Sequence, residues 1–538
     1  MDCIKTLIDK QNSFIDRYTN QSEEILNFYD YKPGLQDEFV RRSETSANGR
    51  EETLAHVIRN YMSDLTLSKA QETNIQNLSK GHKVVIGGQQ AGLFTGPLYT
   101  FHKIISIIIL AKEQSQKLNQ PIIPVFWIAG EDHDFDEVNH TYAYDRITRQ
   151  LNKIKYNTVE PPEKSVSEYV FDEELILKAL DDMFKSIGET KHSKDLKSLI
   201  TQIVKNAHSW SDMFKYLTHE IFKEYGLLVI DAHHPRLREM EKPFFKQIIN
   251  NYKQVDEAFR TTQNNFAEVI KNRMILTDTN VHLFYEYNDK RQLIMADENA
   301  FYLSKDSEVV FSEDELLQLI DNYPERFSNN VVTRPLMEEY LFNTLSFIGG
   351  PSEIIYWGEL KGVFNVLNIE MPIVTPRMRI SYLTQEAKKA IESYELDIND
   401  ILIEGVQSDK DKFIRAQASD EVLREIEKMK DIQTSFHHKL IDEIGDEYQN
   451  RQLIEKNNKI HQHQYQYLLD RYLLNVEREN EISMRHFEII ENTLHPHQGL
   501  QERVWNPVQI MNQFGTDVFS PSTYPPLCYT FEHITIEV

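Results

Sequence analysis

A short loop carries five carboxylates and one imidazole between Gly130 and Glu137. Carboxylates at this density repel one another unless a cation, a hydrogen-bond network or a bound ammonium group compensates them. Such a loop could bind magnesium, could place His133 as a general base between Asp132 and Asp134, or could simply be solvated. We predict Asp132, His133 and Asp134 as catalytic residues and assign no set of metal ligands.

A glycine-rich segment, residues 87–97, joins a β-branched run to an apolar helix. Backbone N–H groups at a helix start favour phosphate or carboxylate, and glycine lets a ligand approach the backbone. The segment lacks the lysine–hydroxyl pair of the Walker phosphate-binding loop, and it does not have the glycine spacing of dinucleotide-binding proteins. A tight packing turn is the alternative. The adjacent amides favour binding, so we predict that Gly88, Gln89 and Gln90 bind a ligand.

A second glycine–proline helix start occurs at residues 349–353. Ser352 and Glu353 lie in its first turn, and Tyr356 and Trp357 follow one turn later. Aromatic rings there could stack on a base or a sugar, although such rings more often belong to a core. We include Ser352, Glu353 and Trp357 among the predicted binding residues.

Three arginines near predicted strands are candidate clamps for carboxylate or phosphate groups: Arg334, Arg377 and Arg379. An exposed arginine without a ligand is the alternative for each. Asp231, followed by the histidines at 233–234, also ends a strand. Two adjacent histidines do not face one point on regular structure, so we predict no metal site there.

Apolar runs ending in glycine or proline predict the elements that position these residues. A strand–helix–strand unit with a right-handed crossover implies a parallel sheet, and a second unit repeats the pattern. The fold class predicted is therefore α/β with a Rossmann-like parallel sheet. The expected strands are 83–88, 122–128, 227–231, 281–285, 345–348 and 372–374, and the expected crossover helices are 97–112 and 351–367.

Residues 384–494 read as almost entirely helical. Val422, Ile426, Met429, Gln433, Phe436 and Leu440 follow coiled-coil spacing, and Leu453, Ile460, Tyr467 and Leu474 repeat every seven residues. Gly445 and Asn450 bracket the expected turn. A hairpin buries only one stripe by itself, so we predict a homodimer through this seam. An ordinary helical domain is the alternative.

The predicted organisation is: 1–80, helical segment packed on the core; 81–138, first half of the core; 139–221, insertion; 222–383, second half of the core with a further insertion; 384–494, coiled-coil domain; and 495–538, tail returning to the core.

The net charge of −25 disfavours binding to nucleic acid or anionic lipid. No apolar stretch approaches the length of a membrane span, and Met1–Lys5 lacks a signal-peptide pattern. Cys3 and Cys528 are the two cysteines of 538 residues, which suits a reducing compartment. We therefore expect a soluble cytoplasmic enzyme that acts on small molecules.

Five blocks together closely resemble the cysteine ligase family of bacillithiol biosynthesis: residues 88–103, 127–140, 329–335, 347–357 and the region of Asn506-Pro507. The resemblance extends over essentially the whole chain. It implies a core similar to class I aminoacyl-tRNA synthetases, with connecting-peptide insertions and a coiled coil. It also implies a ligase that joins cysteine to the amine of glucosaminyl-malate.

The resemblance further implies ATP as the activating substrate, with ADP or AMP as product and magnesium as an option. Aligned with the synthetase nucleotide signature, Thr95, Gly96 and His102 become candidate nucleotide-binding residues, although only the glycine of that signature is kept. Arg377 is assigned to phosphate, and Arg334 or Arg379 to the malate carboxylates. Two other functions stay open: a scaffold protein with a vestigial pocket, or a nucleotidyl or glycosyl transferase on the same sheet.

Overall fold

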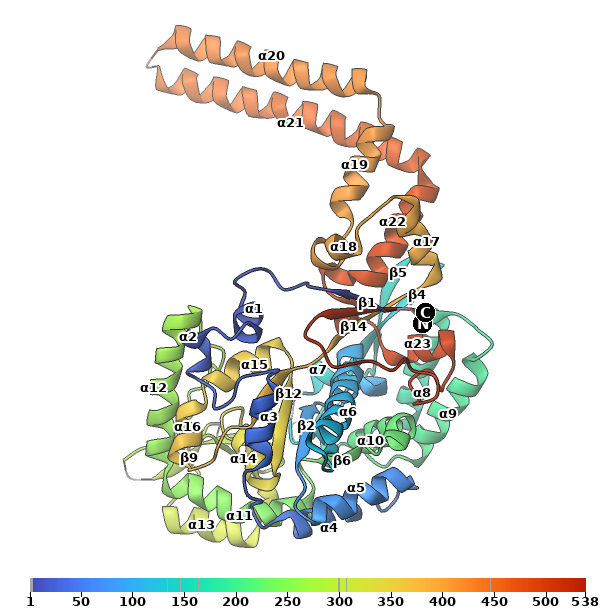
Figure 1. Cartoon of the computed structure of the whole chain (residues 1–538). Coiled ribbons are helices and arrows are strands. Elements are labelled where there is room, and N and C mark those ends of the chain that lie inside the picture. The colour runs from blue at the N-terminus through green and yellow to red at the C-terminus, as the bar shows by residue number, and fades with distance from the viewer. Residues whose placement is uncertain are drawn as a thin grey trace. The chain divides into compact units, whose positions relative to one another are not determined.

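The computed structural model in Figure 1 describes the chain except residues 1–2, 133, 146, 160, 163–164, 299, 306 and 446. The chain forms two compact units. Unit 1 contains residues 1–381, 502–536 and 538, and unit 2 contains residues 382–501 and 537. No helix in the described part of the chain is both long and apolar enough to cross a membrane.

Five parallel strands form the central sheet of unit 1, in the order β13-β12-β2-β3-β6. Most of their residues are buried, because both faces of the sheet are covered; this explains why the runs are apolar throughout. The predicted Rossmann-like parallel sheet is thereby confirmed. The strands are β2 (Val84–Gln89), β3 (Ile123–Ile128), β6 (Leu228–Asp231), β12 (Thr344–Gly349) and β13 (Ile373–Pro376).

The first crossover helix, α6 (Leu98–Leu118), begins directly after Pro97, as expected, but runs six residues beyond the predicted end at Lys112. The apolar run stops near Ala111, yet the polar residues that follow are compatible with a helix. The helix ends where Asn119 adopts a left-handed conformation with φ of 52°.

The helix expected over 351–367 is instead two helices, α15 (Pro351–Gly358) and α16 (Lys361–Val366). Glu359 lies between them, fully buried. Its carboxylate accepts hydrogen bonds from the backbone N–H groups of Met274 at 2.6 Å and Ile275 at 3.0 Å. This tertiary contact accompanies the break between the two helices.

An antiparallel sheet of five strands follows in unit 1, in the order β10-β9-β8-β7-β11. The strand expected from Val281 starts two residues later, because His282 has φ of 63° and its ring binds Asp256 at 2.9 Å. The strands are β7 (Leu283–Tyr287), β8 (Lys290–Ala296), β9 (Phe301–Leu303), β10 (Val310–Phe311) and β11 (Phe327–Asn329).

The other elements, outside the two sheets above and the helices of unit 2, come from both before and after unit 2 in the sequence. A small sheet has the order β1-β15-β14, and β4 pairs with β5. The elements are β1 (Cys3–Thr6), α1 (Phe14–Thr19), α2 (Glu23–Leu26), α3 (Gln36–Ser43), α4 (Glu51–Tyr61), α5 (Lys69–Ser79), η1 (Leu93–Thr95), α7 (Phe135–Val138), β4 (His140–Asp145), β5 (Gln150–Lys155), η2 (Val166–Glu168), α8 (Glu173–Ile187), α9 (Ser193–Asn206), α10 (Trp210–Phe222), η3 (Lys223–Tyr225), α11 (Pro235–Asn250), α12 (Tyr252–Ile270), α13 (Glu313–Asn322), η4 (Pro324–Arg326), α14 (Arg334–Leu341), β14 (Arg379–Leu383), η6 (Gln501–Arg503), α23 (Pro507–Phe514) and β15 (His533–Glu537).

Unit 2 is helical, and its longest helices, α20 and α21, form the predicted hairpin (Figure 1). The turn contains Gly445 at φ of 64° and is shorter than expected, because Asn450 already lies in α21. The helices are α17 (Gln385–Ser393), α18 (Ile398–Glu404), α19 (Gln407–Gln417), α20 (Asp420–Ile444), α21 (Tyr448–Glu479), α22 (Glu481–Leu494) and η5 (Pro496–Gln498).

The predicted seam is not the surface that joins α20 to α21. Ile426 is buried, but Met429 is 40% exposed and Phe436 is 53% exposed. The contact between the two helices instead includes His437, which is 1% exposed and whose Nε2 lies 2.8 Å from Asn457 Oδ1. Heptad spacing finds an apolar stripe, but it does not say which neighbour covers that stripe.

Candidate active site

A small polar cavity of about 130 Å³ lies at the carboxyl ends of β2, β3 and β12. Ligands of open α/β sheets bind at this edge, because the crossover connections leave a crevice there. The cavity is lined by Gly88, Gln89, Gln90, Trp127, Ala129, Asp132, Arg334, Pro335, Glu338, Phe347, Glu353, Tyr356 and Trp357.

The acidic loop reaches this cavity through Asp132. Gln90 donates its side-chain N–H to Asp132 Oδ2 at 2.7 Å, so the glycine-rich segment and the acidic loop are joined directly. The guanidinium of Arg291 lies 3.9 Å from Asp132 Oδ1. Asp132 remains partly exposed, so its carboxylate can meet a ligand that enters the cavity.

Lys103 on α6 fastens two walls of the cavity together. Its Nζ donates to the carbonyl of Gly88 at 2.6 Å, to Gln89 Oε1 at 3.2 Å and to Glu353 Oε2 at 2.6 Å. Burial lowers the pKa of Lys103, while Glu353 opposes that shift. Three acceptors satisfy the three donors of an ammonium group, so this lysine orders the edge of the sheet.

Two residues of α14 give the cavity a cation and a carboxyl group. Burial raises the pKa of Glu338 to about 8, although Arg334 opposes the shift, so this carboxyl is mostly protonated at neutral pH. Burial alone would lower the pKa of Arg334, but Tyr356, Glu131 and Asp132 raise it above its ordinary value. Arg334 therefore supplies a permanent positive charge beside a neutral acid.

A buried ion cluster holds the acidic loop in place through Glu131. Arg238 binds Glu131 at 2.5 Å and Glu241 at 2.6 Å, and all three side chains are almost completely buried. Burial raises the pKa of Glu241 to about 7, and Arg238 partly opposes it. Glu131, a member of the acidic loop, is thus a structural anchor.

A short segment of the 139–221 region also clamps this loop. The backbone N–H groups of Val166 and Ser167 donate to the carbonyls of Asp132 at 2.9 Å and Gly130 at 3.0 Å. Ser167 Oγ donates to Asp231 Oδ2 at 2.6 Å. A Cβ at Gly130 would lie 1.9 Å from Ser167 Oγ, so only glycine fits between these groups.

The predicted nucleotide residues Thr95, Gly96 and His102 lie in contacts within the protein and do not line the cavity. Asn506 donates its side-chain amide to the carbonyls of Leu93, Phe94 and Gly96 at 3.0–3.3 Å. The first N–H of α6, at Leu98, donates to the carbonyl of Trp505 at 2.8 Å. The helix start is therefore capped by the C-terminal tail.

The buried carboxylate of Glu502 holds two more of the predicted residues. It accepts two hydrogen bonds from Arg377, at 2.7 and 2.6 Å, and lies 2.9 Å from His102 Nδ1. Burial opposes ionisation, but Arg377 and His102 hold the pKa of Glu502 well below its ordinary value. Both partners serve to attach the tail to the core.

The other predicted residues are dispersed. Arg379 pairs with Asp9 through two bonds of 2.8 and 2.7 Å. Ser352 and Asp134 are exposed and are not among the lining residues. His133 lies outside the described residues. Gly88, Gln89, Gln90, Asp132, Arg334, Glu353 and Trp357 are the predicted residues that the cavity brings together.

Sequence reasoning did not assign Lys103, Glu338 or Trp127 to the site. Lys103 has a detectable signal, because it is a single charge inside the apolar helical run from Leu98 to Ala111. Glu338 and Trp127 have no comparable signal. Their position follows from the packing of strands and helices that are far apart in the sequence.

The cavity is smaller than a nucleotide. Its volume of about 130 Å³ is below the 300 Å³ or more of pockets that enclose larger ligands, so a bound nucleotide would extend beyond it. Among the described residues, no group of three or more His, Cys, Asp or Glu side chains is arranged to hold a metal.

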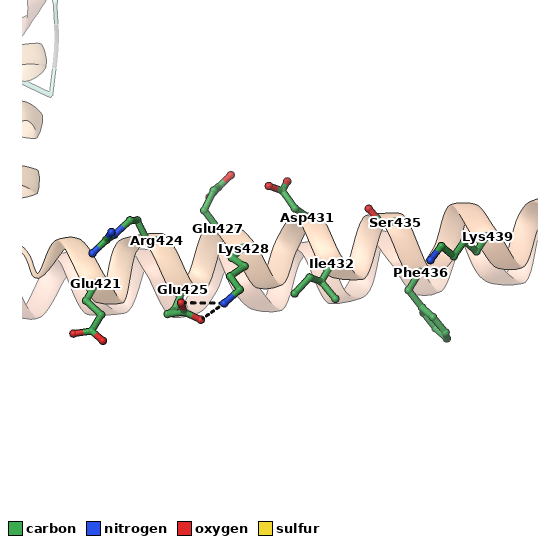
Figure 2. A pocket seen from close by; sticks show the side chains of 10 residues that line it. All are labelled: Glu421, Arg424, Glu425, Glu427, Lys428, Asp431, Ile432, Ser435, Phe436 and Lys439. Carbon is green, nitrogen blue, oxygen red and sulfur yellow. Dashed lines mark hydrogen bonds and ion pairs between the residues drawn. The ribbon is translucent and has the colours of Figure 1, made fainter.

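A second, more open hollow follows the outer face of α20 in unit 2 (Figure 2). All ten lining side chains come from this one helix, and an ion pair joins Lys428 to Glu425 at 3.2 Å. Ile432 and Phe436 lie among charged side chains of both signs. This is an exposed helix face, not a ligand cavity.

The fold and the cavity define a Rossmann-like α/β protein with a small-molecule site at the carboxyl edge of its sheet. Residues 1–378 match the family description "Bacillithiol biosynthesis BshC, N-terminal Rossmann-like domain", and residues 380–538 match "Bacillithiol biosynthesis BshC, C-terminal coiled-coil domain". The chain belongs to the BshC family of bacillithiol biosynthesis.

Relatives cover the full length of the chain. Proteins named "Putative cysteine ligase BshC" are 53% identical in Staphylococcus saprophyticus, 52% in Staphylococcus carnosus and 51% in Staphylococcus aureus. Each alignment covers 100% of this chain and 100% of the relative.

Proposed function

We propose that this chain is a ligase that joins the carboxylate of cysteine to the amino group of glucosaminyl-malate, the last step of bacillithiol formation. The observation that carries the proposal is the cavity at the carboxyl edge of the sheet, in a chain of the BshC family. Asp132, Glu353 and Arg334, which all line the cavity, suit substrates that carry both ammonium and carboxylate groups. Cys3 and Cys528 both remain thiols, which supports a cytoplasmic location.

Amide formation needs an activated carboxylate, because a free carboxylate is a poor electrophile. We propose ATP as the source of activation, with magnesium as its companion ion, on this chemical ground alone. Since a nucleotide would extend beyond the cavity, its phosphate contacts are not assigned to the lining residues alone. ADP leaves if the carboxylate is activated as an acyl phosphate, and AMP leaves if it is activated as an adenylate.

The acidic loop is proposed to receive the attacking amine. An amine is mostly protonated at neutral pH, so a nearby carboxylate binds it as an ammonium ion and a base then removes a proton. Asp132 lies at the cavity and provides the carboxylate. His133, between Asp132 and Asp134 in the sequence, is proposed as the base, since an imidazole titrates near neutral pH.

A reconstituted assay tests this function. The full-length protein is incubated with cysteine, glucosaminyl-malate and each nucleoside triphosphate, with magnesium or with a chelator, and the thiol product is detected by mass. We expect product with ATP, and only when cysteine is present. Turnover without cysteine would indicate a transferase, and no product with any triphosphate would favour a scaffold role.

We also propose a homodimer through the hairpin. Met429, Ile432 and Phe436 are each at least 40% exposed on α20, and the same helix face carries both acidic and basic side chains (Figure 2). A second copy of this face, turned antiparallel, would cover the apolar residues and bring opposite charges together.

A further inference from the structure

Two tryptophans in the cavity wall keep a buried donor without a partner. Trp127 is 2% exposed and Trp357 is 1% exposed. Neither indole N–H has a hydrogen-bond partner among the described residues. Leaving a buried donor unpaired costs free energy, and indole nitrogen can only donate. Both side chains therefore suit a ligand that brings oxygen acceptors into the cavity.

The size and the walls of the cavity restrict that ligand further. A volume of about 130 Å³ suits a molecule of amino-acid size, since a single water occupies about 30 Å³ in the liquid. The indole of Trp357 stacks on Phe347 with ring centroids 4.3 Å apart. Sulfur makes favourable contacts with aromatic rings, so these walls favour a small thiol-bearing side chain.

The cavity lining also combines a cation with carboxyl groups at short range. Arg334 supplies the cation, because Lys103 is already bound to Gly88, Gln89 and Glu353. Glu338 and Glu353 supply carboxyl groups on the neighbouring helices α14 and α15. A zwitterion satisfies this arrangement better than an ion of one sign does.

We propose that this cavity is the amino-acid subsite of the ligase and binds cysteine as a zwitterion. The carboxylate is held by Arg334 and the two indole N–H groups, the ammonium group faces Glu338, and the thiol lies against the aromatic walls. This inference rests on the proposed function, because it divides the two substrates between the cavity and the acidic loop beside it.

Binding of a zwitterion should also change the protonation of Glu338, which can be measured as proton release. Glu338 faces Arg334 on its own helix, Glu353 on α15 and Lys103 on α6, with Glu339 next in sequence, and its pKa is about 8. An ammonium ion beside Glu338 favours the ionised carboxylate. Cysteine binding at pH 7 is therefore expected to release up to about one proton for each ligand bound.

Calorimetry on the full-length protein tests the subsite, with L-cysteine, L-serine and L-malate as ligands in two buffers of different ionisation enthalpy. We expect cysteine to bind with proton release, serine to bind more weakly and malate to bind least. Trp357→Phe removes one indole N–H, and Arg334→Lys removes the guanidinium that can bind a carboxylate through two hydrogen bonds. Each substitution should weaken cysteine binding by about 10-fold to 100-fold. Glu338→Gln should abolish the proton release.

Trp505→Phe is the matched control, since Trp505 is buried and does not line the cavity; its cysteine affinity should equal that of the unmodified protein. In the reconstituted assay, Trp357→Phe should raise the KM for cysteine and leave the KM for glucosaminyl-malate unchanged. A raised KM for glucosaminyl-malate with an unchanged KM for cysteine would contradict the cysteine subsite. So would tight malate binding that Trp357→Phe abolishes. Neither result would contradict the proposed ligase function. Cysteine binding as described without any product would instead contradict the proposed function and support the subsite.

Discussion

The central sheet of unit 1 buries apolar side chains, whereas the hairpin of unit 2 buries a polar side chain and leaves apolar ones exposed. In the sheet, β3 is buried along its whole length, and a charged group beside it, Arg238, lies between two carboxylates. In the hairpin, Phe436 is 53% exposed, whereas its neighbour His437 is 1% exposed. The sheet completes its core within one chain, while the hairpin leaves its apolar stripe exposed.

This difference assigns different roles to the two units. A core that is complete, with its charges paired, can hold a cavity to the precision that binding requires. An apolar stripe among charges of both signs supplies little stability to its own chain but suits association. We expect changes in the sheet region to affect folding and changes in the stripe to affect assembly.

The largest expected effect follows from breaking the buried ion cluster. Arg238→Met leaves Glu131 and Glu241 buried without their cation, which should lower the free energy of unfolding by about 3–5 kcal/mol. All four tryptophans lie in unit 1, so denaturant unfolding followed by tryptophan fluorescence reports on this unit.

Arg424→Met makes the same change on the outer face of α20 and should shift the free energy of unfolding by about 0.5 kcal/mol or less. This is followed by circular dichroism of the helices, because the tryptophans report on unit 1 alone. Equal effects of the two substitutions would show that the two units do not differ as described.

A smaller effect on folding, with a large one on assembly, is expected for Phe436→Glu. A charge in the stripe would prevent its burial against a second copy, so light scattering should report loss of the proposed dimer. The tryptophan unfolding transition should stay within about 0.5 kcal/mol of the original. Leu276→Glu, at a residue that is 85% exposed in unit 1, should leave the dimer intact. A monomeric unmodified protein at micromolar concentration would remove the basis of this prediction.

Local sequence signals were sufficient for the sheet. The runs that became β2, β3 and β12 are apolar and are followed by glycine or a charged loop, so their ends can be placed from neighbouring residues alone. Boundaries set by distant contacts could not be placed. Glu359 binds the backbone of residues 274–275, and no pattern within 351–367 predicts that the helix divides there.

The same distinction applies to the site. Gln90 and Asp132 could be anticipated because each follows a strand of the sheet. Arg334 is one of three candidate arginines, and only the structure separates it from Arg377 and Arg379. Thr95 and His102 could not be separated from the site by sequence, because the groups that engage this helix start, Asn506 and Glu502, lie about 400 residues further along the chain.

The central claim is that chemistry occurs at this cavity, and a pair of neighbouring carboxylates tests it most directly. Asp132 lines the cavity, whereas Asp134 is exposed, is not among the lining residues and begins α7. The measurement is kcat/KM for glucosaminyl-malate with Asp132→Asn and with Asp134→Asn in the reconstituted ligase assay. The account predicts that Asp132→Asn lowers this kcat/KM by about 10-fold to 100-fold, because a charged contact to the ammonium group is lost, and that Asp134→Asn stays close to the original value. Full activity of Asp132→Asn, with loss of activity in Asp134→Asn, would contradict it.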